Sequence, residues 1–161
     1  MKKVLFLLMA MFAFGLQSVN AQMKIVTGHP DLKIKVSRCV ANGKSVFLDI
    51  VLTNEGVNDV ENFHLFINMM YRNRITCYDD QGNVYEENIF AKVANRKEYA
   101  NEWTGDFNLP TDVPIKINIR IDNFSTSAEN IARITLPFEC EGLGLDYNKP
   151  ARIANIPISR D

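Results

Sequence analysis

Ile115-Lys116-Ile117-Asn118-Ile119-Arg120-Ile121 is the stretch of sequence that decides the fold. Isoleucine alternates here with a polar or charged side chain, which is the pattern of a β-strand with one buried face and one solvated face. A helix would scatter the same isoleucines around its axis. We therefore expect a strand of an antiparallel sheet, with its isoleucines facing the core.

The same two-residue period recurs along most of the chain. It predicts further strands at residues 32–36, 45–53, 63–71, 75–78, 83–86 and 131–138. Asn42-Gly43 and the Asp-Asp-Gln-Gly segment 79–82 contain residues that favour tight turns, so each should close a hairpin. In the last strand, the inward side chains should be Ala132, Ile134, Leu136 and Phe138.

The segment 86–108 has no clear period. We expect an irregular crossover between two sheets there. The helical spacing of Ile89, Phe90 and Val93 makes one or two turns of helix the alternative. Residues 99–109 should add one strand before Pro110, which cannot continue a hydrogen-bonded ladder.

About seven short strands without a long helical segment predict an all-β protein, an immunoglobulin-like antiparallel β-sandwich. A closed barrel is the alternative. The chain has 161 residues, of which 47% are hydrophobic and 23% charged, and this composition suits one globular domain that folds without a cofactor. We expect an N-terminal arm over 22–32, the sandwich over 33–140, and an extended C-terminal strap over 141–161 packed on the sandwich.

Residues 1–21 have the form of a signal peptide. Lys2 and Lys3 precede an apolar run at 4–15, and small residues precede Ala21, after which we expect cleavage. An uncleaved membrane anchor is the alternative, but the run is shorter than a bilayer span. The exported chain would be periplasmic or extracellular. It would contain no transmembrane segment, and its 16 Lys+Arg against 19 Asp+Glu, a net charge near −3, argue against nucleic acid as a partner.

The three cysteines leave room for one disulfide, which an oxidising compartment would favour. Cys39 ends the first strand and Cys140 ends the last strong one. Because the first and last strands of such a sandwich can pair in parallel, we expect a Cys39–Cys140 bridge, with buried reduced thiols as the alternative. Cys77 should be a small buried hydrophobic residue.

The sequence contains no recognised catalytic, cofactor-binding or metal-binding motif. Only His29 and His64 could serve a cysteine nucleophile as a base, and no cysteine or histidine spacing matches a zinc site. The Asp79–Asn83 turn has its glycine at the wrong position for a calcium-binding EF-hand loop. We therefore assign no catalytic, cofactor or metal residue.

Two sets of side chains are candidate ligand contacts. We expect Trp103 to occupy a core position in the sandwich, and a platform for a sugar ring formed by the aromatic residues Tyr85, Tyr99 and Trp103 is the alternative. Glu98, Glu102 and Asp106 could supply the carboxylate pair of a glycosidase. With 19 acidic residues in the chain, such a grouping is also expected by coincidence.

The order of these elements resembles the small exported bacterial immunoglobulin-like domains of unknown function. The resemblance covers about residues 33–138 and includes Lys33-Ile34-Lys35-Val36, Leu52-Thr53-Asn54, the turn 78–83 and Phe107-Asn108-Leu109-Pro110. The chain has no lipobox cysteine, unlike many such proteins. The resemblance implies a sandwich without assigned catalytic residues.

These observations favour an exported binding or accessory module of the cell envelope that performs no chemistry. Its partner would be a protein or another envelope component, because sandwich edges and loops present surfaces for recognition. A carbohydrate-binding module with exposed aromatic residues is the first alternative, and a hydrolase with a carboxylate pair is the second. Exposure of Trp103 would favour the carbohydrate-binding module.

Overall fold

The computed structural model describes residues 22–160 except for 70–73, 95 and 147. The predicted signal peptide, 1–21, therefore lies outside the described residues, as does Tyr71 of the predicted strand 63–71. Within the described part of the chain, no helix is long and apolar enough to cross a membrane.

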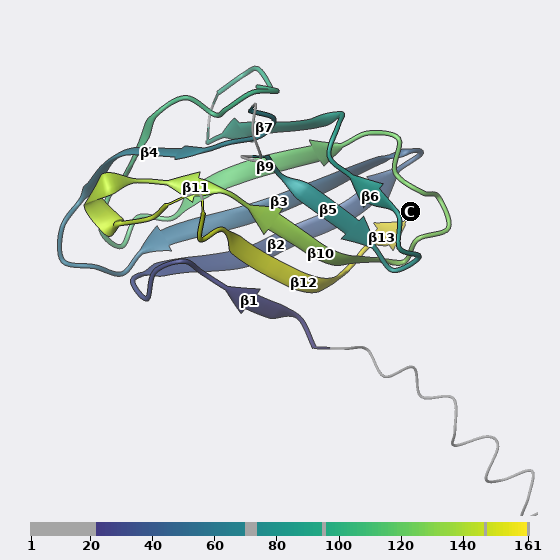
Figure 1. Ribbon diagram of the computed structural model, residues 1–161, viewed down its shortest axis with the longest axis horizontal. Helices are drawn as coiled ribbons and strands as arrows, with labels where there is room; N and C mark the ends of the chain where they lie inside the picture. Colours follow the sequence, from purple (N-terminus) through teal and green to yellow (C-terminus); the bar gives the residue numbers. More distant parts are fainter. Residues whose placement is uncertain (1–21, 70–73, 95, 147, 161) are drawn as a thin grey trace, which may run out of the picture.

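Two five-stranded sheets enclose one hydrophobic core and form a sandwich (Figure 1). The front sheet in Figure 1 has the order β1 (Lys24–Val26), β12 (Ala151–Pro157), β10 (Asn130–Leu136), β5 (Thr76–Asp79), β6 (Val84–Tyr85). The back sheet has the order β13 (Ser159–Arg160), β2 (Leu32–Asn42), β3 (Ser45–Asn54), β9 (Ile115–Ile121), β7 (Ile89–Val93). The predicted all-β sandwich is confirmed, and because both sheets end in edge strands it is an open sandwich rather than a closed barrel.

A small third sheet extends one end of the sandwich (Figure 1). It has the order β11 (Phe138–Glu139), β4 (Val60–Leu65), β8 (Phe107–Leu109), and the 3₁₀ turn η1 (Glu141–Leu143) follows β11. Phe63 of β4 contributes a fully buried ring to the core, with the rings of Phe107 and Phe138 each 5.2 Å from it. The third sheet therefore shares the core of the two large sheets.

β3 and β9 form the centre of the back sheet. β2 and β3 are joined by the predicted hairpin turn, in which Gly43 has φ 59°, a value that glycine adopts without strain. β9 pairs with β3 from Ile115 to Ile121, and Ile117 and Ile119 are fully buried. The predicted alternation holds here because one face of each strand lies on the core.

The alternation slips by one residue in β10. Ile131 and Ile134 are both fully buried, whereas Ala132 is only half-buried. A register shift between Ile131 and Arg133, opposite β5, accounts for this, because a β-bulge inserts one extra residue into a strand. The prediction that Ala132 faces inward is therefore wrong, while Ile134 and the positions beyond it face the core as predicted.

β7 replaces the expected crossover or helical turn at residues 89–93. It pairs antiparallel with β9 at five positions, and Ile89, Ala91 and Val93 are buried. Phe90 and Lys92 face outward. The outward Phe90 disguised the strand period in the sequence, because a large apolar residue on the solvent face imitates helical spacing. β8 lies within 99–109, where one additional strand was predicted.

The two terminal segments are paired as strands. β1 lies in the predicted N-terminal arm and pairs antiparallel with β12. The C-terminal strap forms β12, which lies between β1 and β10, and β13, which pairs parallel with β2. The strap therefore extends both sheets and contributes the buried Ile153 and Ile156 to the core.

The cysteines do not form the predicted Cys39–Cys140 bridge. All three are buried free thiols. The parallel neighbour of β2 is β13, with Ser159 opposite Val40, and not the strand that ends near Cys140. Cys140 instead follows β11, where its Sγ lies 3.5 Å from the carbonyl oxygen of Glu61. The prediction was wrong because it paired the wrong final strand with β2.

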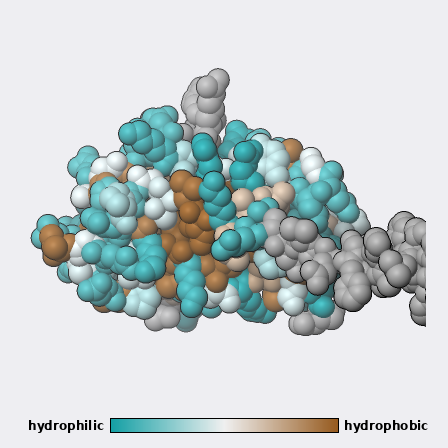
Figure 2. Space-filling view, turned by 90° about the horizontal axis from the view of Figure 1, so that it is seen from below, coloured by the Kyte–Doolittle hydropathy of each residue, from teal (hydrophilic) through white to brown (hydrophobic). Residues whose placement is uncertain are grey.

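The core is incompletely covered on one side of the sandwich. Figure 2, which views the molecule from below Figure 1, shows an apolar area in the middle of this side. β1 and β2 run along it in Figure 1, and their residues Ile25 and Val36 pack on the core but are only partly buried. β3 pairs with one edge of β2 along its length, whereas β13 pairs with only two residues on the other edge. Among the described residues, the rest of that other edge has no neighbouring strand.

Candidate ligand-binding face

The outer surface of the back sheet carries a strong excess of positive charge. Its four long strands, β2, β3, β9 and β7, contain six lysine or arginine residues and one acidic residue, Asp49. Because the inward positions hold the apolar core, the charged side chains point outward. We call this surface the cationic face. Its positive residues are Lys33, Lys35, Arg38, Lys92, Lys116 and Arg120.

The strand register arranges the outward side chains of the cationic face in rows. Arg38, Asp49, Asn118 and Lys92 form the central row, one residue from each strand. Neighbouring strands lie about 4.8 Å apart, so Arg38 and Lys92 are separated by about 14 Å across the sheet. Positive charge is therefore spread along the face rather than gathered at one point.

Half of these positive side chains are neutralised within the molecule. The pairs are Lys33 with Glu55, Lys116 with Asp49, and Arg120 with Asp122, at nitrogen–oxygen distances of 2.6, 2.8 and 3.3 Å. Asp49 is buried and also accepts a hydrogen bond of 2.5 Å from Asn118 Nδ2. Within the described part of the chain, Lys35, Arg38 and Lys92 have no acidic partner. These three charges remain available to a ligand.

Aromatic rings lie among the charges of the cationic face. The guanidinium carbon of Arg120 lies 4.5 Å from the ring centre of Phe90 and 5.1 Å from that of Tyr99. Lys92 Nζ lies 4.9 Å from the Tyr99 ring centre. Burial raises the pKa of the Tyr99 phenol, and the nearby Arg120 charge only partly opposes this, so the hydroxyl stays protonated at neutral pH. The cation–π contacts hold the ring in a defined orientation.

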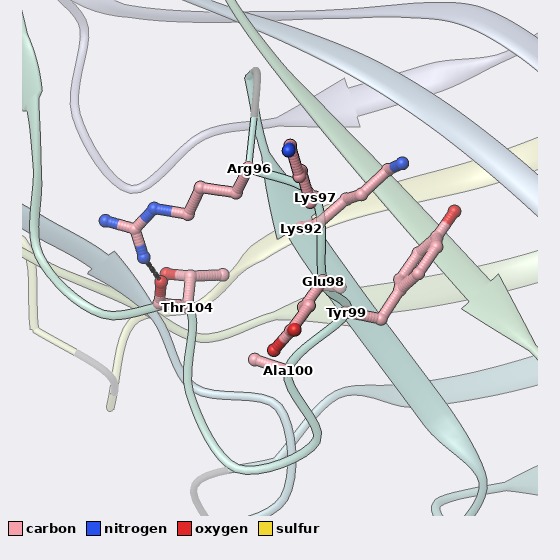
Figure 3. Close-up of a pocket in the computed structure, with 8 residues that line it drawn as sticks. Lys92, Arg96, Lys97, Glu98, Tyr99, Ala100 and Thr104 are labelled. Atoms are coloured by element: carbon pink, nitrogen blue, oxygen red, sulfur yellow. Dashed lines mark hydrogen bonds between the residues drawn. The ribbon is translucent and has the colours of Figure 1, made fainter.

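A hollow of about 470 Å³ opens beside Tyr99, where the chain leaves β7 (Figure 3). Its charged lining consists of Lys92, Arg96, Lys97 and Glu98. In Figure 3 the amino groups of Lys92 and Lys97 point to the same side, and the carboxylate of Glu98 points away from them. Within the described residues, neither Lys97 nor Glu98 has an ion-pair partner. The hollow thus offers positive charge, a carboxylate that can accept hydrogen bonds and an aromatic wall.

Arg96 stabilises the loop that forms this hollow. Its guanidinium donates hydrogen bonds to the carbonyl oxygens of Thr104 and Asp106. Gly105, between them, has φ 68°, and a Cβ atom there would lie 2.7 Å from Arg96 Nη1. The backbone conformation therefore favours glycine at this position, and a larger residue would also displace the Arg96 guanidinium.

A second hollow of about 440 Å³ lies at the hairpin end of the same face. It is lined by Arg38, Val40 and Phe47 together with the turn residues Asn42 and Gly43. Arg38 belongs to the same row of the sheet as Lys92, which lines the first hollow. The cationic face therefore has one hollow at Lys92 and a second hollow at Arg38.

The predicted aromatic contacts do not form a single strip. Tyr85 lies in the front sheet, where its hydroxyl donates to Asp79 Oδ2 at 2.8 Å and its ring stacks on Phe124 at 4.4 Å. Tyr99 lines the hollow of the cationic face. Trp103 is 40% exposed, so the prediction that it occupies a core position is wrong.

Trp103 belongs to a cluster of side chains that are far apart in the sequence. Its ring meets the ring of His64 edge-on, with the centres 5.5 Å apart. His64 Nδ1 lies 3.1 Å from Asp106 Oδ1, and His64 Nε2 lies 3.2 Å from Glu139 Oε2. His64 and Glu139 meet only because β4 pairs with β11. No local sequence signal could have indicated this contact.

The three candidate carboxylates of a glycosidase have separate surroundings. Glu98 lines the hollow beside Tyr99, and Asp106 pairs with His64. Glu102 contributes its backbone carbonyl to hydrogen bonds with the amides of Ile67 and Asn68. Among the described residues, no three histidine, cysteine or acidic side chains gather to hold a metal ion.

No protein-family model matches the chain. No curated protein matches it either. A family 123 glycoside hydrolase from Clostridium perfringens is a solved structure similar to this chain, with a TM-score of 0.40 and 14% identity over 75% of this chain. This chain spans only 21% of that enzyme. A second similar structure is AvmM, which catalyses macrocyclization in alchivemycin A biosynthesis; the TM-score is 0.39 and the identity 10%, over 67% of this chain and 71% of that one. A third is the family 3a carbohydrate-binding module of the scaffoldin of Clostridium thermocellum, with a TM-score of 0.31 and 11% identity over 70% of this chain and 97% of that one.

Proposed function

We propose that this protein is an exported, non-catalytic binding module of the cell envelope and that its cationic face holds an anionic partner. One observation carries this proposal. The four long strands of the back sheet contribute six positive side chains and one negative one to its outer surface, and after the ion pairs with Asp49, Glu55 and Asp122 three positive charges remain, in a chain whose net charge is −1. Such a local excess attracts an anion and orients it before contact.

The unpartnered side chains add to this support. Lys35, Arg38 and Lys92 have no acidic partner in the described part of the chain, so an anionic ligand need not displace an internal ion pair. They project from paired strands, which hold them more rigidly than loops would. The two hollows have volumes of about 470 and 440 Å³, within the range typical of ligand sites.

Retention on immobilised heparin, used as a generic polyanion, tests the proposal. The triple variant Lys35→Gln, Arg38→Gln, Lys92→Gln removes the unpartnered positive charges. Its matched control is Lys24→Gln, Lys149→Gln, Arg152→Gln, which changes the net charge equally at exposed positions outside the cationic face.

We expect the unmodified protein and the control triple variant to elute at similar salt concentrations. The variant of the cationic face should elute at markedly lower salt, because its three charges act together on the same ligand. An equal shift for both triple variants would show that only net charge matters, and would overturn the proposal. Thermal unfolding of each variant checks that its fold is intact.

A further inference from the structure

We infer that the anionic ligand is an acidic polysaccharide, a chain of uronic acid residues, with one sugar ring seated in the hollow beside Tyr99. This inference rests on the proposed function and narrows it to one chemical class. The hollow combines two ammonium groups, a carboxylate and an aromatic ring, and this combination suits an acidic sugar better than positive charge alone would.

The hollow offers a different partner for each part of a uronic acid residue. Lys92 and Lys97 present ammonium groups to one side (Figure 3), where they can pair with the sugar carboxylate. Glu98 has no ion-pair partner among the described residues and can accept hydrogen bonds from sugar hydroxyl groups. The Tyr99 ring, fixed by Lys92 and Arg120, supplies an aromatic wall for the apolar C–H groups of the sugar.

Glu98 argues against a bare phosphate polymer as the ligand. A carboxylate in the lining repels a phosphate, and a fully ionised inorganic phosphate chain has no hydroxyl donors to compensate. A uronic acid carries its single negative charge at one end of the ring and hydroxyl groups elsewhere. The separation of Glu98 from the two ammonium groups in Figure 3 matches this distribution.

The second hollow indicates a chain rather than a single sugar. Arg38 lines it and lies about 14 Å from Lys92 across the sheet. One monosaccharide in the first hollow cannot reach that far, whereas an extended acidic chain can place a further carboxylate there. Simultaneous contacts at both hollows would raise affinity through effective concentration.

Calorimetric titration at low ionic strength tests the inference. The probes are oligogalacturonate, alginate oligomers, the methyl ester of the same oligogalacturonate, and inorganic polyphosphate. The methyl ester keeps the sugar and removes the charge, whereas polyphosphate keeps the charge and removes the sugar. Glu98→Gln is compared with Glu102→Gln, which makes the same change at an exposed residue that does not line the hollow.

We expect at least one uronate oligomer to bind and its methyl ester to bind about tenfold more weakly, a loss of roughly 1.4 kcal/mol. Glu98→Gln should weaken uronate binding several-fold and strengthen polyphosphate binding, whereas Glu102→Gln changes neither. Tyr99→Leu should weaken uronate binding and leave polyphosphate binding within about twofold.

Tighter binding of polyphosphate than of every uronate, with Glu98→Gln strengthening both, would overturn the acidic-sugar inference and leave the proposed function standing. Equal binding of the methyl ester and the free acid would overturn the role of charge, and with it both proposals. Binding of neither uronates nor polyphosphate would also overturn both.

Discussion

Asp79 organises the β5–β6 turn, and replacing it tests whether the hydrogen bonds seen there stabilise the fold. Asp79 is only 2% exposed. Its Oδ1 accepts the amides of Gln81 and Asn83 at 2.9 and 2.8 Å, and its Oδ2 accepts Asn83 Nδ2 and the Tyr85 hydroxyl at 2.7 and 2.8 Å. The variant Asp79→Asn keeps the shape of the side chain and the Oδ1 acceptor. It removes the charge and the acceptor at Oδ2.

The expected loss of unfolding free energy in Asp79→Asn follows from the two hydrogen bonds at Oδ2. Hydrogen bonds to a charged group contribute about 1.5–3 kcal/mol each, and the turn is close to the surface, so we expect a loss of about 3 kcal/mol at pH 7. The melting temperature should fall by roughly 6–12 °C. Urea unfolding measures the free energy directly. Asp112→Asn is the control, because Asp112 is exposed and its φ of 59° suits asparagine.

The pH dependence of the folding stability supplies an independent check of the role of Asp79. Burial alone would raise the pKa of Asp79, but the hydrogen bonds from Asn83, Tyr85 and Gln81 outweigh it and hold the pKa below its usual value. The stabilisation is therefore complete above the unfolded pKa of about 3.9 and disappears as the pH falls through the lower folded pKa. A difference between the protein and the variant below about 0.5 kcal/mol at pH 7, or one that persists unchanged at very low pH, would refute this reasoning.

Four further predictions follow from the core, the cysteines, the hollow and the cationic face. Ile119→Ala should lower the free energy of unfolding by about 2–5 kcal/mol, and Ile119→Val should lower it by about 0.5–1.5 kcal/mol, as measured by urea unfolding. Equal losses for the two variants would contradict tight packing at this position. Burial raises the pKa of Cys39 to about 12 and raises that of Cys77 as well, so the native protein should resist iodoacetamide at pH 8, and each of these two thiols should lower the stability above about pH 9 by roughly 1.4 kcal/mol per pH unit. Mass spectrometry should find all three thiols alkylated only after unfolding, and a Cys39–Cys140 disulfide would contradict the structure. Gly105→Ala should destabilise more than Gly144→Ala, since both have positive φ but only the former meets a neighbouring side chain; equal melting temperatures would show that Arg96 moves freely. Retention on heparin should fall steeply as salt rises past about 0.1 M, and retention insensitive to salt would speak against charge as its cause.

The cationic face shows how far sequence reasoning reached the candidate site. The alternation around Ile117 predicted that Lys116 and Arg120 face solvent, and the same period placed Lys35 outside. It could not show that β2 and β9 flank the same strand, because strand order depends on contacts between residues far apart in the chain. The excess of charge on one surface emerged only when that order was known.

Tyr99 and Trp103 were named as candidate contacts from their residue type alone. The structure places Tyr99 against Lys92 and Arg120 in a hollow of the cationic face, and Trp103 against His64. Tyr85, the third candidate, is held by Asp79 and Phe124 as part of a turn. Residue type indicates what a side chain can do, whereas its neighbours decide which of those roles remains open.

The sequence by itself determined the class of fold, because a two-residue hydrophobic period can bury one face of a chain only as a strand in a sheet. It also determined the hairpin turns, since positive φ at Gly43 depends on local backbone sterics alone. Only the tertiary structure decided the partner of β2, the bulge in β10, the strand at 89–93 and the free state of the cysteines. These features depend on non-local pairing, in which each strand adopts the register and neighbour that best complete a shared core, and no single stretch of sequence contains that information.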